Sequence, residues 1–184
     1  MIRIFDFLLS LIGLVILSPF LLTLSIIGLF DTGKPFFIQQ RVGINKKAFS
    51  LIKFRTMHPN TKSVATHLAN QNSITKFGRF LRKTKLDELP QLVNVLLGDM
   101  SLVGPRPNLY NQEELIEERD KRGVYSILPG ITGLSQIREI DMSTPEKLAL
   151  SDAEMAKEMN IRLYFYYIFA TISGKGSGDR IKIK

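Results

Sequence analysis

Two adjacent carboxylates, Asp87 and Glu88, follow a segment in which five of ten residues are basic. Nearby Lys and Arg side chains keep carboxylates ionised, and the positive end of a helix dipole acts in the same direction. An ionised carboxylate can attack phosphorus, and its oxygens can also hold Mg²⁺ while leaving positions for substrate phosphates. These residue types therefore indicate phosphate chemistry. The simpler interpretation is that Asp87 caps a helix and Glu88 complements its dipole.

Arg106 is the second residue whose setting suggests chemistry, because it lies between Pro105 and Pro107. The two prolines restrict the local backbone, so the guanidinium can be held in place. Arginine is suited to bidentate recognition of phosphate, and phosphoryl transfer depends largely on positioning and charge neutralisation. A structural arginine paired with surface carboxylates would give the same sequence.

The segment before the carboxylates, Ser73–Lys85, is predicted to form a helix because Ile74, Phe77 and Leu81 recur on one face. Much of the remaining surface is Lys and Arg, a pattern typical of a helix that faces a membrane or phosphates. A solvated helix packed on a core would show the same pattern.

The carboxylates themselves are predicted to begin a second helix, Asp87–Leu97. Pro90 is tolerated in its first turn, where a backbone N–H has no partner within the helix. Asp87 is then the expected N-cap, and Gly98 is well placed to end the helix.

The rest of the pattern predicts an α+β fold that is mainly helical, with amphipathic interfacial helices and a small β-hairpin. The hairpin would pair Phe36–Ile38 with Ala48–Phe54 across a basic turn. The segment Ile161–Ile172 is apolar and aromatic and suits either the membrane interface or the core. The other predicted elements are a loop at Pro59–Asn72, a rigid bend at Gly104–Pro107, a charged helix at Asn111–Arg122, a glycine-rich loop at Leu128–Gly133, and a helix that Thr144 caps and Pro145 begins.

The N-terminal segment Ile4–Phe30 contains one charged residue, Asp6, and is long enough to be a transmembrane candidate. Ser18-Pro19 divides it into arms of roughly 21 and 16 Å, neither of which crosses a hydrocarbon core of about 30 Å. The segment is therefore either one kinked spanning helix or a re-entrant hairpin. Basic residues flank it, and the positive-inside rule places the rest of the chain in the cytoplasm. The expected units are a membrane-inserted helix, 1–31, and a cytoplasmic membrane-associated domain, 32–184.

Composition narrows the choice of partner. The net charge of +8 favours polyanions, but there is no interleaving of aromatic and basic residues of the kind that stacks nucleotides. The apolar N-terminus therefore favours membrane lipid over nucleic acid. Because the chain has no cysteine, disulfides, thiolate metal sites and Cys nucleophiles are excluded. His58 and His67 are predicted to be solvated loop residues.

Several motifs in a fixed order identify a family. They are Arg3–Asp6, Ser18-Pro19, Gln40–Gly43, Lys53–Met57, Leu86–Gln91, Gly98–Pro107 and Pro129–Gly133. From Arg3 to about Gln136 the chain resembles the bacterial sugar transferases, specifically the small monotopic polyprenyl-phosphate phosphoglycosyl transferases.

The resemblance implies a two-step mechanism. Asp87 would attack the β-phosphorus of a UDP-sugar and release UMP, and undecaprenyl phosphate would then attack the covalent sugar-phosphate intermediate. Glu88 would support the reaction through the metal or the incoming phosphate. The implied cofactor is Mg²⁺, held by Asp87 and Glu88. The expected phosphate- or substrate-binding residues are Arg82, Arg106, Arg41, Lys53 and Arg55. The resemblance also implies that the Ser18-Pro19 helix is re-entrant, at the bacterial inner membrane.

The chain departs from the family pattern after Gly133. Many relatives continue Trp-Ala-Gln-Val-Asn-Gly-Arg, whereas this chain reads Leu134–Ile140, so the sugar is the least determined feature. A modified UDP-N-acetylhexosamine is the family-level expectation, in the first membrane step of surface glycan assembly. Two alternatives stay open: a non-catalytic adaptor that docks on lipid, and a metal-dependent hydrolase of nucleotide sugars. Homo-oligomerisation also stays open.

Overall fold

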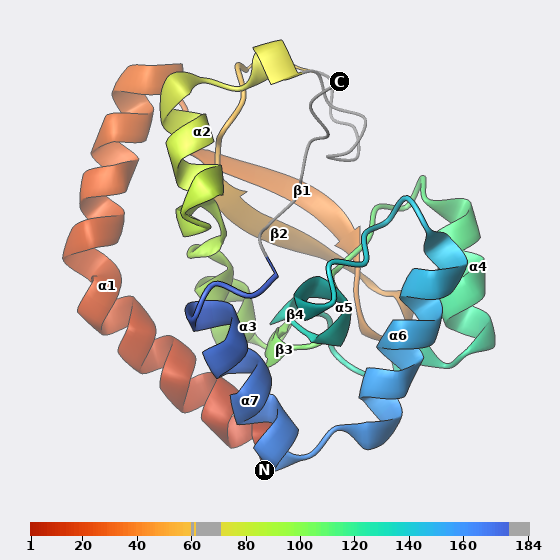
Figure 1. Cartoon of the computed structure of the whole chain (residues 1–184). Coiled ribbons are helices and arrows are strands. Elements are labelled where there is room, and N and C mark those ends of the chain that lie inside the picture. The colour runs from red at the N-terminus through yellow and green to blue at the C-terminus, as the bar shows by residue number, and fades with distance from the viewer. Residues whose placement is uncertain (60, 62–70, 177–184) are drawn as a thin grey trace.

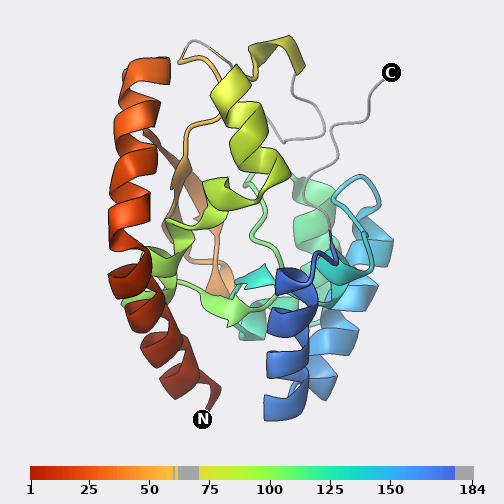
Figure 2. The ribbon, with the colours of Figure 1, turned by 60° about the vertical axis from the view of Figure 1, so that its left-hand side comes forward.

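The computed structural model describes residues 1–59, 61 and 71–176. It has a mainly helical fold with a small antiparallel hairpin, as the sequence predicts. Figures 1 and 2 show the N-terminal helix along one side of the molecule and the helices of residues 113–121 and 145–158 on the other, with the hairpin between them. The predicted His67 loop residue lies outside the described residues, and His58 is exposed.

The N-terminal segment is one continuous helix, α1 (Ile2–Thr32), which ends at Gly33 in the left-handed conformation, φ 71°. It is long and apolar enough to cross a membrane, and most of it is exposed. Pro19 lies inside the helix, which bends in its middle part (Figure 1). A proline leaves the carbonyl four residues earlier without its usual donor. Here the Ser18 hydroxyl donates to that carbonyl, on Val15, at 2.8 Å.

Polar contacts fasten both ends of α1 to the rest of the chain. Near the start, the buried Asp6 accepts hydrogen bonds from the Ser101 hydroxyl (3.0 Å), the next backbone N–H (2.8 Å) and the Tyr164 hydroxyl (2.8 Å). At the other end, the Asp31 carboxylate accepts from the Thr75 hydroxyl at 2.6 Å. The helix therefore lies against the following domain at both ends.

The predicted hairpin is confirmed. Strand β1 (Phe36–Val42) pairs antiparallel with β2 (Ala48–Phe54), from Phe36 opposite Phe54 to Val42 opposite Ala48. β1 is longer than predicted because its polar second half continues the ladder with β2 as far as the 3₁₀ turn η1 (Ile44–Lys46).

The helix predicted at Asp87–Leu97 is wrong at its start. After α2 (Lys76–Lys83), a 3₁₀ turn, η4 (Leu86–Glu88), carries the carboxylates, and α3 (Gln91–Leu97) follows. A capping residue has extended backbone torsions outside the helix, whereas Asp87 lies inside the turn, so it does not cap α3. The predicted stop is confirmed: Gly98 is left-handed, φ 99°.

A second, parallel pair of short strands joins the segment just before the predicted bend to the predicted glycine-rich loop. Strand β3 (Ser101–Val103) pairs with β4 (Gly130–Thr132). The backbones approach so closely that a Cβ on Gly130 would lie 2.0 Å from the Gly104 nitrogen. Only glycine permits this approach, which fixes the segment before Arg106 against the segment after Pro129.

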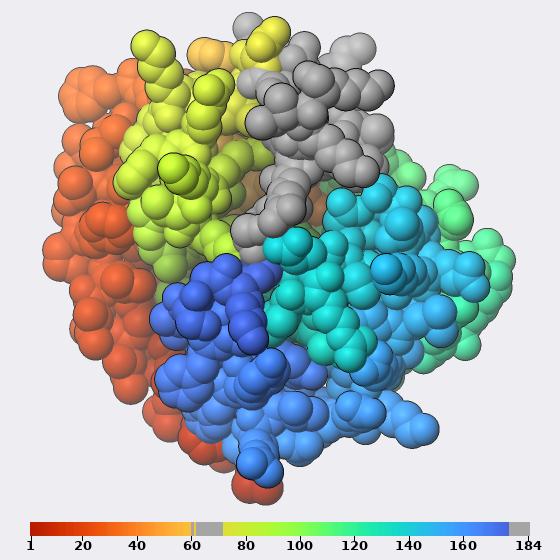
Figure 3. Space-filling model, viewed as in Figure 1, coloured from red at the N-terminus to blue at the C-terminus, as the bar shows by residue number. Residues whose placement is uncertain are grey.

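The C-terminal half consists of α4 (Glu113–Lys121), the 3₁₀ turn η5 (Val124–Ser126), α5 (Leu134–Ile137), α6 (Pro145–Glu158) and α7 (Ile161–Ile172). The core interpretation of Ile161–Ile172 is confirmed for one face of α7, and the membrane-interface interpretation stays a prediction for its exposed face. Tyr164 and Tyr167 are buried in a core cluster with Met155, whereas Phe169 and Ile172 are exposed. Figure 3 shows α1, α2 and α7 together on one side of the surface.

Candidate active site

The adjacent carboxylates lie on η4, directly after a residue in an unusual backbone conformation. Lys85 has φ 58°, the left-handed region that a side chain rarely adopts, and it turns the chain from α2 into the 3₁₀ turn. The turn buries Asp87, which is 9% exposed. The site therefore depends on strained backbone next to the acidic pair.

Several charges act on the Asp87 carboxyl. Burial, and after it the neighbouring Glu88, raise the pKa of Asp87 from 3.8 to about 6, while Lys53, Arg82 and Arg106 oppose the rise. The carboxyl is therefore ionised at neutral pH but poorly solvated. A carboxylate in this state can act as a nucleophile if a phosphate enters beside it.

Arg106 forms an ion pair with Glu88, with 2.6 Å between Nη2 and Oε1. Both side chains are largely buried, at 28% and 18% exposure. The arginine therefore pairs with the acidic turn and not with a surface carboxylate, and the Gly104–Pro107 bend is brought to the site. Its guanidinium also opposes the rise in the pKa of Asp87.

Arg82, near the end of α2, has one nitrogen without a hydrogen-bond partner among the described residues. Its Nε donates to the Thr56 hydroxyl at 2.8 Å, which fixes the guanidinium. Its Nη1 is buried and has no hydrogen-bond partner among the residues described. A buried guanidinium nitrogen without a partner is costly, and an anionic ligand would satisfy it.

The remaining three predicted basic residues divide into two groups. The positive charge of Lys53 lowers the pKa of Asp87, and its Nζ lies 5.5 Å from the centre of the Phe37 ring. Arg41 instead donates to the Pro107 carbonyl at 3.0 Å, and Arg55 donates to backbone carbonyls beside β1. The structure brings Lys53, Arg82 and Arg106 together at Asp87, and it gives Arg41 and Arg55 contacts to backbone.

The acidic pair fits a magnesium ion that is shared with a substrate. Within the described part of the chain no group of three or more His, Asp or Glu residues could hold a metal. Mg²⁺ commonly binds through one or two carboxylates together with substrate phosphates. A divalent cation would offset the mutual repulsion of Asp87 and Glu88. A diphosphate would supply further oxygen ligands, so the cation would bind most strongly when a diphosphate is present.

Lys85 is a site residue that the sequence analysis missed. Burial and Arg106 lower its pKa, Glu88 raises it, and its Nζ donates to the Lys175 carbonyl at 3.2 Å. Its position immediately before Leu86-Asp87-Glu88 was the available signal. Arg138, in the segment that departs from the family pattern, is instead held by both oxygens of Glu154, at 2.6 and 2.7 Å.

Comparisons with known proteins give the chain its family. A family model described as bacterial sugar transferase matches residues 1–175. The exopolysaccharide production protein PSS of Rhizobium leguminosarum bv. phaseoli is 37% identical, over 95% of this chain and 96% of that protein.

Two longer relatives carry names that state a reaction. The UDP-glucose:undecaprenyl-phosphate glucose-1-phosphate transferase of Escherichia coli (strain K12) is 37% identical over 91% of this chain and 38% of its own length. The undecaprenyl-phosphate galactose phosphotransferase of Salmonella typhimurium is 40% identical over 77% of this chain and 34% of its own length. These matches confirm the resemblance: the chain belongs to the bacterial sugar transferase family and is an enzyme of the phosphoglycosyl transferase class.

Proposed function

We propose that this enzyme transfers a sugar 1-phosphate from a UDP-sugar to undecaprenyl phosphate through a covalent intermediate on Asp87. The observation that carries the proposal is the buried Asp87 carboxylate, which lies among three basic side chains. Lys53, Arg82 and Arg106 lower its pKa and so oppose the rise that burial causes. The names of both longer relatives describe a sugar phosphotransferase that acts with undecaprenyl phosphate. The reaction would be the first membrane step of surface glycan assembly, in keeping with the exopolysaccharide name of PSS.

In the first step, an Asp87 oxygen attacks the β-phosphorus of the UDP-sugar. A bond forms between that oxygen and phosphorus, and the bond to the bridging oxygen breaks, so UMP leaves with the electron pair. In the second step, an undecaprenyl phosphate oxygen attacks the same phosphorus and displaces the Asp87 carboxylate. The product is a lipid-linked diphosphate sugar, and the carboxylate is regenerated.

The surrounding residues orient and neutralise the phosphates. The buried Arg82 Nη1 is available for a phosphate oxygen, and Lys53 adds positive charge beside the nucleophile. Arg106 holds Glu88 in position. Phosphoglycosyl transferases of this family are generally metal-dependent. We assign Mg²⁺ to Asp87 and Glu88, where it would neutralise the charge of the diphosphate.

We further propose that α1 is re-entrant, so that the domain of residues 32–184 lies on the cytoplasmic face of the bacterial inner membrane. Contacts at both ends of α1, through Asp6 and Asp31, support this topology, because one domain holds both ends. The exposed apolar residues of α7, such as Phe169 and Ile172, would lie in the interfacial layer. Because the chain has no cysteine, one introduced at position 2 reports topology by labelling. Labelling only from the periplasm would contradict re-entrance.

A modified UDP-N-acetylhexosamine remains the donor that the family resemblance favours. The names of the two longer relatives contain glucose and galactose, so the test must include those sugars. Arg138, the one basic residue of Leu134–Ile140, pairs with Glu154 and not with Asp87 or Glu88.

The decisive experiment measures UMP release by the purified, detergent-solubilised enzyme across a panel of UDP-sugars. The wild-type enzyme should release UMP, and a sugar phosphate should be found on Asp87 by mass spectrometry. Asp87→Asn should abolish both, whereas Asp120→Asn, in an exposed ion pair with Lys46, should not. Full turnover by Asp87→Asn would exclude the covalent mechanism, and UMP release without a lipid product when undecaprenyl phosphate is supplied would indicate a hydrolase. An adaptor would release no UMP.

A further inference from the structure

We propose that Arg119 and Asp152, two buried residues distant in sequence from the carboxylates, are positioning residues that fix Arg106 against Glu88. The inference concerns how the site is assembled and rests on the proposed function for its kinetic readout. Arg119 lies on α4 and Asp152 on α6, so the helices of the C-terminal half would set the geometry of the reacting turn.

The two side chains form a fully enclosed ion pair. Arg119 is 1% exposed and Asp152 is 0% exposed. Both Nε and Nη2 of Arg119 donate to the same Asp152 oxygen, at 3.0 and 2.6 Å. The other Asp152 oxygen accepts from the Ser135 hydroxyl at 2.6 Å. The carboxylate is therefore held from two directions, and it fixes the plane of the guanidinium.

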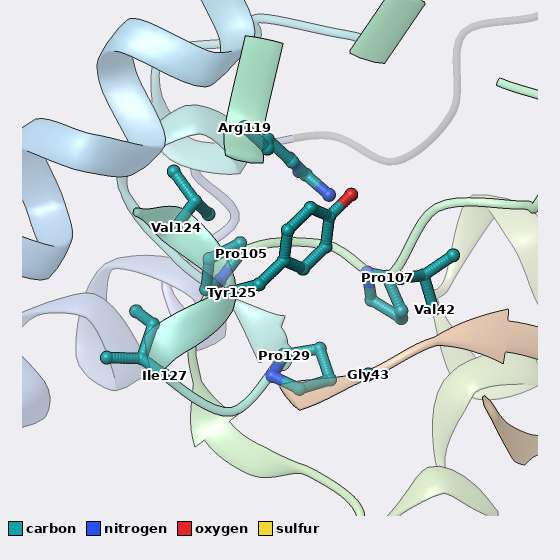
Figure 4. Close-up of a pocket in the computed structure, with 9 residues that line it drawn as sticks. All are labelled: Val42, Gly43, Pro105, Pro107, Arg119, Val124, Tyr125, Ile127 and Pro129. Atoms are coloured by element: carbon teal, nitrogen blue, oxygen red, sulfur yellow. The ribbon is translucent and has the colours of Figure 1, made fainter. Parts of the chain in front are cut away.

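The third nitrogen of Arg119 reaches the loop that carries Arg106. Nη1 donates to the Arg106 backbone carbonyl at 3.0 Å and to the Asn108 side-chain oxygen at 2.9 Å. The Tyr125 hydroxyl donates to the same Asn108 oxygen at 3.0 Å. Figure 4 shows the Arg119 and Tyr125 side chains converging beside Pro105 and Pro107. One guanidinium thus joins α6 to the backbone of the residue that pairs with Glu88.

The next two carbonyls of the loop are also held. Arg41 donates to the Pro107 carbonyl at 3.0 Å, and the Val42 N–H donates to the Asn108 carbonyl at 3.0 Å. Three successive carbonyls therefore have fixed donors, from α4, a β1 side chain and the β1 backbone. With the backbone so restrained, the Arg106 side chain reaches the Glu88 oxygen at 2.6 Å.

Burial of an ion pair is weak evidence for stability, because desolvation offsets the attraction of the charges. The shape of this pair points to positioning instead. A planar guanidinium presents several donors in a fixed fork, whereas a lysine offers one nitrogen. Lysine at position 119 could contact Asp152 or the Arg106 carbonyl, but it could not hold both in their present places.

A double-mutant cycle tests the proposal. The rate of UMP release is measured for the wild type, Arg119→Lys, Arg106→Gln and the double variant, with the UDP-sugar of the panel that the wild type uses fastest. Arg119→Lys should lower kcat about tenfold or more and change KM less. In the Arg106→Gln background it should have almost no further effect, within about twofold. Equal losses in both backgrounds would overturn the proposal, because loss of folded enzyme does not depend on Arg106.

Two additions keep the test decisive. Asp120→Asn, at the neighbouring position of α4, removes only an exposed pair with Lys46 and should leave kcat unchanged. If Arg119→Lys does not fold, Tyr125→Phe removes one hydroxyl of the same network and should show the same dependence on Arg106, at a few-fold. If Tyr125→Phe lowers kcat equally with and without Arg106→Gln, the inference is also refuted.

Hydrogen exchange separates this inference from the proposed function. Arg119→Lys, or Tyr125→Phe in its place, should accelerate amide exchange in the Gly104–Leu109 loop and at Val42, relative to Asp120→Asn. This result does not depend on turnover. An enzyme that releases no UMP would refute the proposed function alone, whereas unchanged loop exchange would refute the positioning role.

Discussion

Replacing Asp87 by asparagine should make the folded enzyme more stable at neutral pH, in addition to removing the nucleophile. The carboxyl is 9% exposed and its pKa is raised to about 6 by burial and by Glu88. An ionised carboxylate is therefore less favourable in the folded chain than in the unfolded chain. Asparagine has nearly the same shape and no charge, so it removes that cost.

The pKa rise sets the size of the effect. Each pKa unit corresponds to about 1.4 kcal/mol, so a rise from 3.8 to about 6 gives an upper bound of about 3 kcal/mol for the stabilisation. For a chain of this length that corresponds to an increase in Tm of roughly 6 to 12 °C. The sign follows from linkage: below about pH 4 the carboxyl is neutral in both states and the two proteins are equally stable. The difference grows between about pH 4 and 6 and is complete above that.

The assay is thermal unfolding followed by far-ultraviolet circular dichroism, in one detergent, with divalent cations removed by a chelator. Metal removal matters because a bound cation would stabilise the carboxylate. Asp120→Asn is the matched control, since its carboxyl is exposed in a surface pair and should change stability little at any pH. A gap between Asp87→Asn and the wild type that is absent at about pH 8, or that is equally large near pH 4, would refute the reasoning.

Three further outcomes follow from the structure. UMP release at low UDP-sugar concentration should fall about tenfold per pH unit below about 6, where Asp87 takes up a proton. Glu88→Gln should move this fall to lower pH, because it removes a negative charge that raises the pKa of Asp87. An unchanged pH profile in Glu88→Gln would contradict the interaction between the two carboxyls. Asp6→Ala should lower the unfolding free energy by about 3 kcal/mol, measured by thermal or urea unfolding, because three donors lose their acceptor. Gly130→Ala should prevent stable folding or strongly lower Tm, since its Cβ would lie 2.0 Å from the Gly104 nitrogen, and an unchanged Tm would show that the strands can separate.

Sequence periodicity predicted those elements whose signals are local. The hairpin follows from β-prone runs on either side of a turn, and the end of α3 follows from Gly98. The β3–β4 pair was missed because each strand has three residues and joins segments nearly thirty positions apart. The predicted start of α3 was wrong because Lys85, in the left-handed conformation, turns the chain before the carboxylates. That conformation is rare for a residue other than glycine, so the sequence does not predict it.

For the site, sequence and structure contribute differently. Asp87, Glu88 and Arg106 are conspicuous because of their neighbours, and the family motifs supplied their expected roles. Arg41 and Arg55 looked equivalent to Lys53 in the motifs, yet they contact backbone carbonyls. A basic residue that holds a carbonyl and one that binds a phosphate have the same sequence signature. The buried network around Arg119 could not be predicted, because it depends on the packing of helices that are distant in the chain.

The contact between Asp6 and Tyr164 has a consequence for how the protein is made. The two residues are 158 positions apart, so α1 leaves the ribosome long before α7 exists. A carboxylate in a membrane helix is costly when it has no partner. The nascent helix therefore carries an unsatisfied carboxylate until the strand at Ser101 and finally α7 are synthesised. The hydrogen bond from Tyr164 completes the set of donors to Asp6, so α1 can settle in its final position against the domain only after α7 has been synthesised.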